Sequence, residues 1–281
     1  MKKAISGWCF PGLSVKESMI AAKKAGFDGI ELTVEETGET GLESTPEKWA
    51  EIRADADEIG ISIHSIGTGL HWHYPLSADD EAIREKGIAI AEMQLDMAKV
   101  MGADAILVVP GAVDARFMPN FKPVSYDTVY ERALAAFMRL KVKAEAMKIH
   151  IGVENVQSWN LFLLSPLEMR DFIDKIDSPY VGAFLDVGNV VPHGFPEQWI
   201  RILGKRIRKV HFKDYRINAG GFEGFVDLLS GDVNWPAVMD AFREVGYNGW
   251  ATAEMIPPYK YHPAQNVINA CGAMRKIFGE V

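Results

Sequence analysis

The chain has 281 residues, of which 48% are hydrophobic and 24% are charged, and this ordinary globular composition excludes intrinsic disorder and collagen-like repeats. Its 30 basic and 38 acidic residues give a formal net charge of −8, which repels phosphate backbones and weighs against nucleic-acid binding. No apolar stretch approaches the ~20 residues that a membrane span requires. The segment before Pro11 lacks the apolar core of a signal peptide, so we expect a cytoplasmic protein with no membrane attachment.

Eight short apolar runs alternate with longer amphipathic segments along the chain. Most runs are rich in Val, Ile, Ala or Phe, as is typical of strands that are buried on both faces. We therefore expect strands at residues 3–6, 29–32, 61–66, 105–109, 149–154, 181–186, 207–212 and 249–254.

A helix is predicted after each of these strands. Ser14 and Glu17 form a capping box for the first helix, and Gly26 provides its stop. Thr45 followed by Pro46 marks the start of the second helix. The expected helices cover about residues 14–25, 46–60, 79–101, 126–147, 165 onward, 196–203, 234–246 and 263–278.

Eight strand–helix repeats in a chain of this length predict an α/β fold, a single (β/α)₈ TIM barrel that spans residues 1–281 as one domain. A doubly wound open sheet is the alternative, but it calls for a glycine-rich fingerprint that residues 7–12 do not match. The longest irregular stretches are 67–78, 110–125 and 214–234. All three follow strands, so we expect them on the face where barrel enzymes carry out their chemistry.

Four polar residues lie at the ends of consecutive strands five to eight: Glu154, Asp186, His211 and Glu254. The intervals of 32, 25 and 43 residues are repeat distances of a barrel, so the four side chains are predicted to converge. Three uncompensated carboxylates would cost several kcal/mol, a cost that one divalent cation removes. Oxygen and imidazole ligands suit Mn²⁺, Mg²⁺, Co²⁺ or Zn²⁺. The alternative is four unrelated polar residues in water or in salt bridges.

Five motifs occur in a characteristic order: Gly-Val-Glu-Asn at 152–155, Phe-Leu-Asp-Val-Gly-Asn at 184–189, Val-His-Phe-Lys-Asp at 210–214, Gly-Asp-Val-Asn-Trp at 231–235 and Thr-Ala-Glu-Met at 252–255. In this respect the chain resembles, over nearly its whole length, the xylose-isomerase-like superfamily of sugar isomerases and epimerases. The pattern is most similar to the branch that contains L-ribulose-5-phosphate 3-epimerases and hexulose-6-phosphate isomerases.

The resemblance implies that Glu154, Asp186, His211 and Glu254 bind one divalent metal ion, and that Glu154 and Glu254 also form the catalytic acid/base pair. The metal would bind two neighbouring oxygens of a ketose and stabilise a cis-enediolate. The favoured substrate is a ketose phosphate, and a homodimer or homotetramer is implied only by resemblance.

The sequence departs from the ketose 3-epimerase pattern at Asn189, where that branch has a histidine. An amide can bind a hydroxyl but cannot titrate near neutral pH, which weighs against free-ketose 3-epimerase activity and against the related apurinic endonuclease. Two other functions remain open. One is a metal-dependent lyase on the same scaffold, either inosose-dehydratase-like or C-glycoside-cleaving, and the other is a non-catalytic sugar-binding barrel.

Several further residues are candidate substrate contacts. Asn189 and Lys213 or Arg216 could bind a hydroxyl or a phosphate, although a solvated loop charge is an equal alternative for the two cations. His64 is expected first as a packed histidine and second as a contact, and Glu31 could form a hydrogen bond across the barrel mouth. The remaining candidates follow strands one, three and five, with the tryptophans expected to exclude water from the site: Trp8, His71, Trp72 and Trp159.

Overall fold

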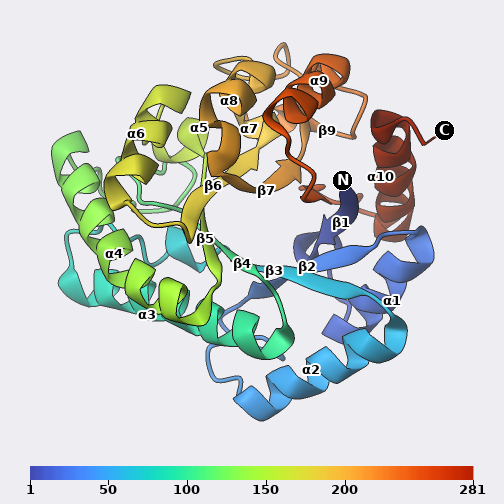
Figure 1. Cartoon of the computed structure of the whole chain (residues 1–281), viewed down its shortest axis with the longest axis horizontal. Coiled ribbons are helices and arrows are strands. Elements are labelled where there is room, and N and C mark those ends of the chain that lie inside the picture. The colour runs from blue at the N-terminus through green and yellow to red at the C-terminus, as the bar shows by residue number, and fades with distance from the viewer. Residues whose placement is uncertain (281) are drawn as a thin grey trace.

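The structure is a computed structural model that describes residues 1–280. Within these residues eight parallel strands pair side by side and close into a barrel in the order β1-β10-β7-β6-β5-β4-β3-β2 (Figure 1). This closure confirms the predicted (β/α)₈ barrel, and it excludes an open doubly wound sheet because β1 pairs with both β2 and β10. The barrel strands are β1 Lys2–Ser6, β2 Gly29–Val34, β3 Ser62–Thr68, β4 Ala105–Val108, β5 His150–Glu154, β6 Val181–Asp186, β7 Ile207–Phe212 and β10 Trp250–Ala253.

Helices surround the barrel on the outside, as Figure 1 shows. The helices of the repeats are α1 Val15–Ala25, α2 Pro46–Ile59, α3 Glu81–Met101, α4 Tyr126–Met147, α6 Pro166–Ile176, α8 Pro196–Leu203, α9 Trp235–Val245 and α10 Pro263–Phe278. Two four-residue helices, α5 Gln157–Asn160 and α7 Val187–Val190, begin within three residues of the ends of β5 and β6. The sequence pattern did not predict these two, because four residues are too few to show a period.

The helix boundaries follow from local chemistry. The Ser14 side chain accepts a hydrogen bond from the Glu17 backbone, the Glu17 carboxylate reaches back to Ser14, and this capping box starts α1. Gly26 ends the helix at a φ of 100°, a conformation that costs a residue with a Cβ atom more than it costs glycine. Thr45 and Pro46 begin α2 as the sequence predicts.

The stretch 214–234, expected to be irregular, contains a small antiparallel hairpin of β8 Asp214–Tyr215 and β9 Phe225–Val226. The Asp214 carboxylate holds this hairpin loop together. It accepts hydrogen bonds from the backbone of Tyr215, Leu229 and Val233 and from the indole of Trp235, at 2.9 to 3.2 Å. A residue at the start of the loop is therefore bonded directly to its end.

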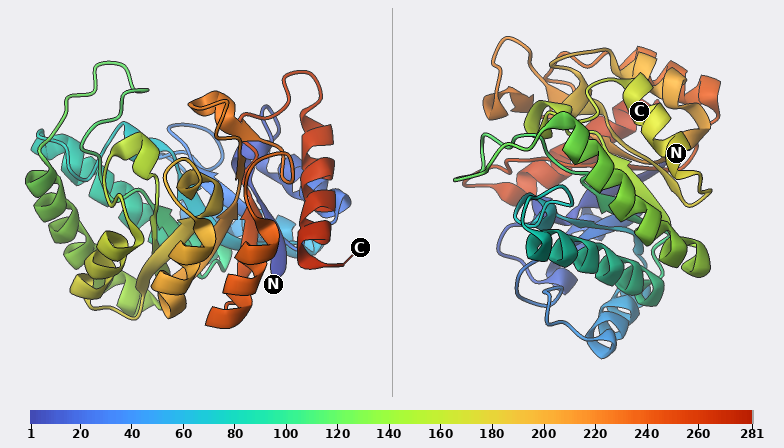
Figure 2. Two further views of the ribbon diagram at one scale, coloured as in Figure 1. Left: turned by 90° about the horizontal axis from the view of Figure 1, so that it is seen from above. Right: turned by 90° about the vertical axis from the view of Figure 1, so that its left-hand side faces the viewer.

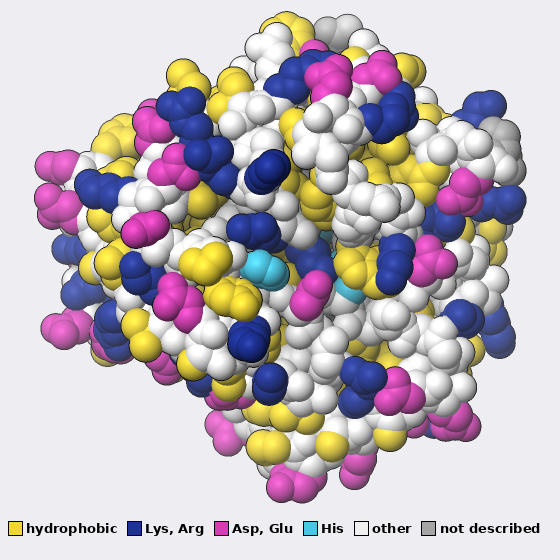
Figure 3. Space-filling view, in the orientation of Figure 1, with side chains coloured by type: hydrophobic (Ala, Val, Ile, Leu, Met, Phe, Trp, Pro, Cys, Tyr) yellow, Lys and Arg dark blue, Asp and Glu magenta, His cyan; other side chains and the backbone are white. Residues whose placement is uncertain are grey.

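The two ends of the barrel differ in what they carry. In the left view of Figure 2 the loops that follow the strands lie at the upper end, and both chain termini lie at the lower end. On the face seen in Figure 3 basic and acidic side chains are interspersed, without a large area of one sign. Throughout residues 1–280 no helix is both long enough and apolar enough to cross a bilayer.

Candidate metal centre

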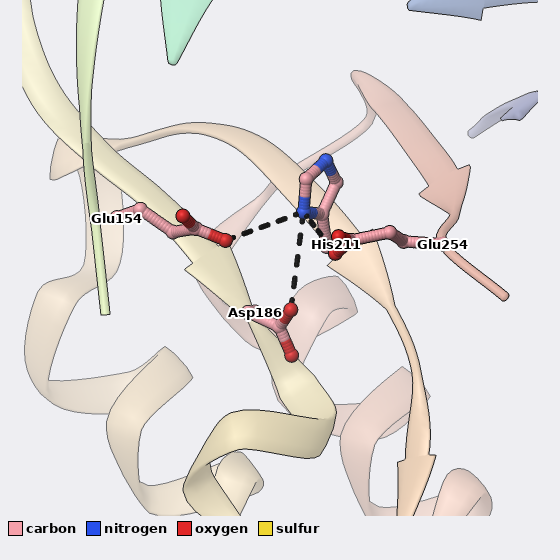
Figure 4. Close-up of side chains that lie close together, drawn as sticks. All are labelled: Glu154, Asp186, His211 and Glu254. Carbon is pink, nitrogen blue, oxygen red and sulfur yellow. Dashed lines mark ion pairs between the residues drawn. The ribbon is translucent and has the colours of Figure 1, made fainter. Parts of the chain in front are cut away.

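Four polar side chains meet at the end of the barrel where the strands finish. Glu154 and Asp186 are the last residues of β5 and β6, His211 lies near the end of β7, and Glu254 directly follows β10. The strand register pairs Asp186 with His211, and the Glu254 amide donates a hydrogen bond to the Phe212 carbonyl. Figure 4 shows the three carboxylates directed toward the imidazole. The sequence prediction of a converging cluster is confirmed.

The donor atoms lie close enough to share one ion. His211 Nδ1 is 3.5 Å from Glu154 Oε1, 3.8 Å from Asp186 Oδ2 and 2.9 Å from Glu254 Oε2. One ligand atom from each of the four residues lies within 4.8 Å of the others. All four residues are buried, with exposed fractions between 0% and 6%. The cluster can therefore accept one cation in an environment shielded from bulk water.

Glu31 on β2 orients the imidazole. Its Oε1 lies 3.0 Å from His211 Nε2, and its Oε2 accepts a hydrogen bond of 2.8 Å from Ser65. With Nε2 occupied by Glu31, His211 presents Nδ1 to the three other carboxylates. A metal-binding histidine commonly has such a partner on its second nitrogen. The expected hydrogen bond of Glu31 across the barrel is thus present.

Burial and neighbouring charges shift the titration of the cluster. Burial raises the pKa of Glu154 to about 7 and also raises the pKa of Asp186. Burial alone would raise the pKa of Glu254, but Lys213 and His211 outweigh it and lower that pKa to about 2. Burial alone would lower the pKa of His211, but Glu31 and Glu254 outweigh it and hold the pKa well above its usual value. The cluster therefore holds several charged groups at a buried position, where the loss of hydration raises the free energy of each charge.

Unsatisfied polar atoms support a cation at this position. Three of the eleven buried side-chain atoms that form no hydrogen bond of acceptable geometry in the described residues are Asp186 Oδ2, His211 Nδ1 and Glu254 Oε2, and the two oxygens are in ion contact with Lys213. Leaving buried polar atoms unpaired costs about 1–3 kcal/mol each, and more for charged groups. These three atoms come together in one cluster, and its three carboxylates and one imidazole fit a divalent ion bound to oxygen and nitrogen.

Lys213 brings a cation to the edge of the cluster. Its Nζ lies 2.7 Å from Glu254 Oε2 and 3.1 Å from Asp186 Oδ2. Burial alone would lower the pKa of Lys213, but Asp186 and Glu254 outweigh it and raise the pKa. Gly188 allows this close packing, since a Cβ atom there would stand 2.5 Å from the Cβ of Lys213.

A cavity of about 360 Å³ opens above the cluster. Its polar lining comes from Glu154, Glu254, Asn189 and Lys213, together with Thr68. The rest of its lining consists of Gly69, Val109, Val156, Ile256 and six aromatic residues, namely Trp8, Trp72, Phe117, Trp159, Phe222 and Phe225. The predicted contacts Asn189, Lys213, Trp8 and Trp159 thus come together around one space.

Three other predicted contacts lie elsewhere. His64 is enclosed in the barrel, between the Ser65 and Thr252 hydroxyls. His71 is buried, with Nε2 3.3 Å from the Gly87 carbonyl, and burial lowers its pKa to about 4. Arg216 lines a neighbouring hollow, and its guanidinium donates to the Ser230 carbonyl. None of the three lines the cavity, so the structure gives no support to their contact with a substrate.

Sequence reasoning named Asn189 but missed Asn155, an amide that supports the site. Asn155 Oδ1 accepts a hydrogen bond from the Asp186 amide at 2.7 Å, and Asn155 Nδ2 donates to the Asp186 carbonyl at 2.9 Å. Asn189 Nδ2 donates to the Asn155 carbonyl at 3.0 Å, while its Oδ1 accepts no hydrogen bond from the described residues. The position of Asn155, directly after Glu154 at a strand end, was the available signal.

Comparison with known proteins identifies the family of this chain. The family model of the xylose isomerase-like TIM barrel matches residues 19–277. The chain is 24% identical to the L-ribulose-5-phosphate 3-epimerase UlaE of Shigella flexneri, over 91% of this chain and 87% of that protein. Two solved structures each cover 99% of this chain and are themselves covered to 99%. The first is D-psicose 3-epimerase from Clostridium cellulolyticum H10, with a TM-score of 0.81 and 19% identity. The second is 3-keto-D-glucoside 4-epimerase, YcjR, from E. coli, with a TM-score of 0.77 and 18% identity. The chain belongs to the xylose isomerase-like TIM barrel family.

Proposed function

We propose that this protein is a divalent-metal-dependent sugar epimerase or isomerase that transfers a proton at a carbon next to a carbonyl group. The observation that carries the proposal is the convergence of three carboxylates and one imidazole beneath a cavity. The named activities of the relatives, which include 3-epimerases of sugars and sugar phosphates, agree with it.

Glu154, Asp186, His211 and Glu254 are the residues that would hold the ion. A divalent cation bound there would act as a Lewis acid, polarising the substrate carbonyl and acidifying the neighbouring C–H bond. The oxygen and nitrogen donors suit Mn²⁺, Mg²⁺, Co²⁺ or Zn²⁺.

Glu154 and Glu254 are the proposed acid and base. Both line the cavity, and their strands β5 and β10 are separated in the barrel by β6 and β7, so the carboxylates reach the cavity from different sides. One glutamate removes the proton from one face of the carbon and leaves a cis-enediolate of the sugar. The other glutamate returns a proton to the opposite face, which inverts that carbon. Return of the proton to the neighbouring carbon would instead give isomerisation, and the arrangement allows either reaction.

Other lining residues would bind the sugar. The Oδ1 atom of Asn189 is available to accept a hydrogen bond from a hydroxyl, and Lys213 can donate one. Trp8 and Trp159 would exclude water from the carbanion-like intermediate.

Solvent isotope exchange tests the proposal directly. The full chain, supplied with Mn²⁺ in D₂O, is incubated with free ketoses, ketose phosphates and keto-glycosides, and the sugars are analysed by NMR. We expect deuterium at one carbon of one substrate class, and loss of exchange with EDTA. Absence of exchange in every class, together with absence of bound metal, would instead indicate a binding protein.

A further inference from the structure

Six aromatic side chains line the cavity above the carboxylates, and we refer to them as the aromatic cup: Trp8, Trp72, Phe117, Trp159, Phe222 and Phe225. They come from the loops after five different strands, β1, β3, β4, β5 and β7. The left view of Figure 2 shows the loop after β4, which carries Phe117, rising above the barrel. Separate loops thus bring one kind of side chain to one place.

The rings of the cup are arranged against one another. Phe117 makes edge-to-face contacts with Trp72 at 4.8 Å, Phe222 at 5.6 Å and Trp159 at 6.4 Å between ring centroids. Trp159 in turn stacks on Phe222, with the ring centroids 4.2 Å apart and an angle of 13° between the ring planes. These are favoured geometries for aromatic pairs. Phe222 is nevertheless 48% exposed, so the cup keeps apolar surface open toward solvent. An apolar, concave and exposed surface beside polar anchors is typical of a ligand site.

The charges around the cup do not suit a phosphate. Among the described residues that line the cavity, the charged ones are Glu154, Glu254 and Lys213. Lys213 is already paired with two carboxylates, and Arg216 faces a neighbouring hollow. A phosphate in the cup would find no arginine and a single lysine that is already paired, whereas phosphate sites normally supply arginine, lysine or several N–H donors.

We propose that the aromatic cup binds an uncharged aromatic aglycone, so that the substrate is a glycoside and not the sugar phosphate favoured by the sequence. The sugar ring then lies over Glu154 and Glu254, a placement that rests on the proposed function. A glycosidic carbon is an acetal and offers no carbonyl, so proton transfer requires a ketone elsewhere on the ring. A dehydrogenase must therefore supply the substrate by removing two electrons and two protons from a ring alcohol, with its nicotinamide or flavin cofactor as the acceptor.

Ligand binding tests this proposal independently of turnover. The probes are matched phenyl and methyl glycosides of glucose, galactose, mannose and xylose, together with the corresponding sugar phosphates. Binding is measured by calorimetry on the full chain with Mn²⁺, and repeated with the Glu154→Gln variant. We expect at least one phenyl glycoside to bind about tenfold more tightly than its methyl partner, and no sugar phosphate to bind more tightly than its parent sugar.

Two truncations locate the aglycone site. Phe117→Ala and Phe222→Ala should each lower the phenyl preference about three- to tenfold. Phe195→Ala removes a ring that is 63% exposed at the start of α8 and outside the cavity, and it should leave the preference unchanged. Thermal unfolding of each variant checks that the fold is intact.

Three results would overturn the proposal. They are a sugar phosphate that binds more tightly than its parent sugar, the lack of any phenyl preference, and an equal loss of phenyl and methyl affinity in Phe117→Ala. The last result would mean that the cup only packs the loops. A non-catalytic barrel would still show the phenyl preference without isotope exchange, whereas an enzyme for sugar phosphates would show the exchange without the preference.

Discussion

Two histidines are buried in the same barrel, and their surroundings drive their titration in opposite directions. His64 on β3 lies between two hydroxyl groups, at 3.1 Å from Ser65 Oγ and 3.0 Å from Thr252 Oγ1, and stacks on Trp250. Burial lowers its pKa well below the usual value. His211 on β7 faces four carboxylates, and its pKa is held well above the usual value in spite of equal burial.

The difference shows that the partners of a buried histidine, and not its burial, decide its charge and its role. Both ring nitrogens of His64 have a neutral hydroxyl partner, so the hydrogen-bonding capacity of the imidazole is satisfied within the protein. His211 Nδ1 has only carboxylate neighbours and no hydrogen bond of proper geometry among the described residues. The region around His64 is built for stability, and the region around His211 is built to receive a ligand.

Removing a proposed acid or base should produce the largest effect. Glu154→Gln and Glu254→Gln each keep the shape of the side chain but cannot exchange a proton, so we expect turnover to fall about 10²- to 10⁴-fold. Deuterium exchange into the substrate measures the loss, and circular dichroism checks the fold. Near-native exchange in either variant would contradict the acid/base assignment.

A fall in pH should reduce the stability of the protein through a buried neutral histidine that lies outside the charged cluster. Burial lowers the pKa of His71 to about 4, so between pH 6.5 and 4 the unfolded chain binds a proton that the folded chain does not. This contribution to stability is complete above pH 6.5 and is lost as the pH falls toward 4, by about 3 kcal/mol.

Urea unfolding of the native protein and His71→Gln at pH 7 and pH 4 measures this contribution. The variant should lose less stability between the two pH values than the native protein. Equal losses would show that His71 is not the titrating group.

Glu31 connects the two regions, because its carboxylate contacts both His211 and Ser65. Glu31→Gln should weaken the binding of Mn²⁺ about 10- to 100-fold, because His211 loses the partner that directs Nδ1 to the cluster. Calorimetric titration with Mn²⁺ measures the affinity. Glu35→Gln, an exposed change just after the same strand, is the matched control. Unchanged affinity in Glu31→Gln would refute the orienting role.

The smallest effect is expected at His64. Thr252→Val removes the hydroxyl bonded to His64 Nε2 and should cost about 1 kcal/mol of unfolding free energy. Because Thr252 lies opposite His211 in the strand register, this variant also tests whether the two regions are independent. A fall in Mn²⁺ affinity comparable to that of Glu31→Gln would show that they are coupled.

The barrel and the cluster of four were accessible from sequence because their signals are local. Each barrel strand is a short apolar run, and Glu154, Asp186 and Glu254 stand where such runs end. Chain order then fixes the positions of these residues around the mouth, since successive strands of a parallel barrel are neighbours.

The aromatic cup was only partly accessible, because it depends on where long loops fold. Trp8 and Trp159 follow strands closely and were predicted, but Phe117 and Phe222 lie in the middle of segments with no periodic pattern. The direction of Arg216 was equally hidden, because its partner is a backbone carbonyl 14 residues away.

The Asp214 hydrogen bonds described above also bear on how this protein could change its ligand. They fasten the two ends of the loop that presents Phe222 and Phe225, and none of these hydrogen bonds uses a side chain of the tip, residues 216–228. Substitutions at the tip can therefore alter the shape and polarity of the entrance without loosening the strand that carries His211. In such an architecture new specificities can evolve by exchange of a few tip residues, while the reaction centre is inherited unchanged.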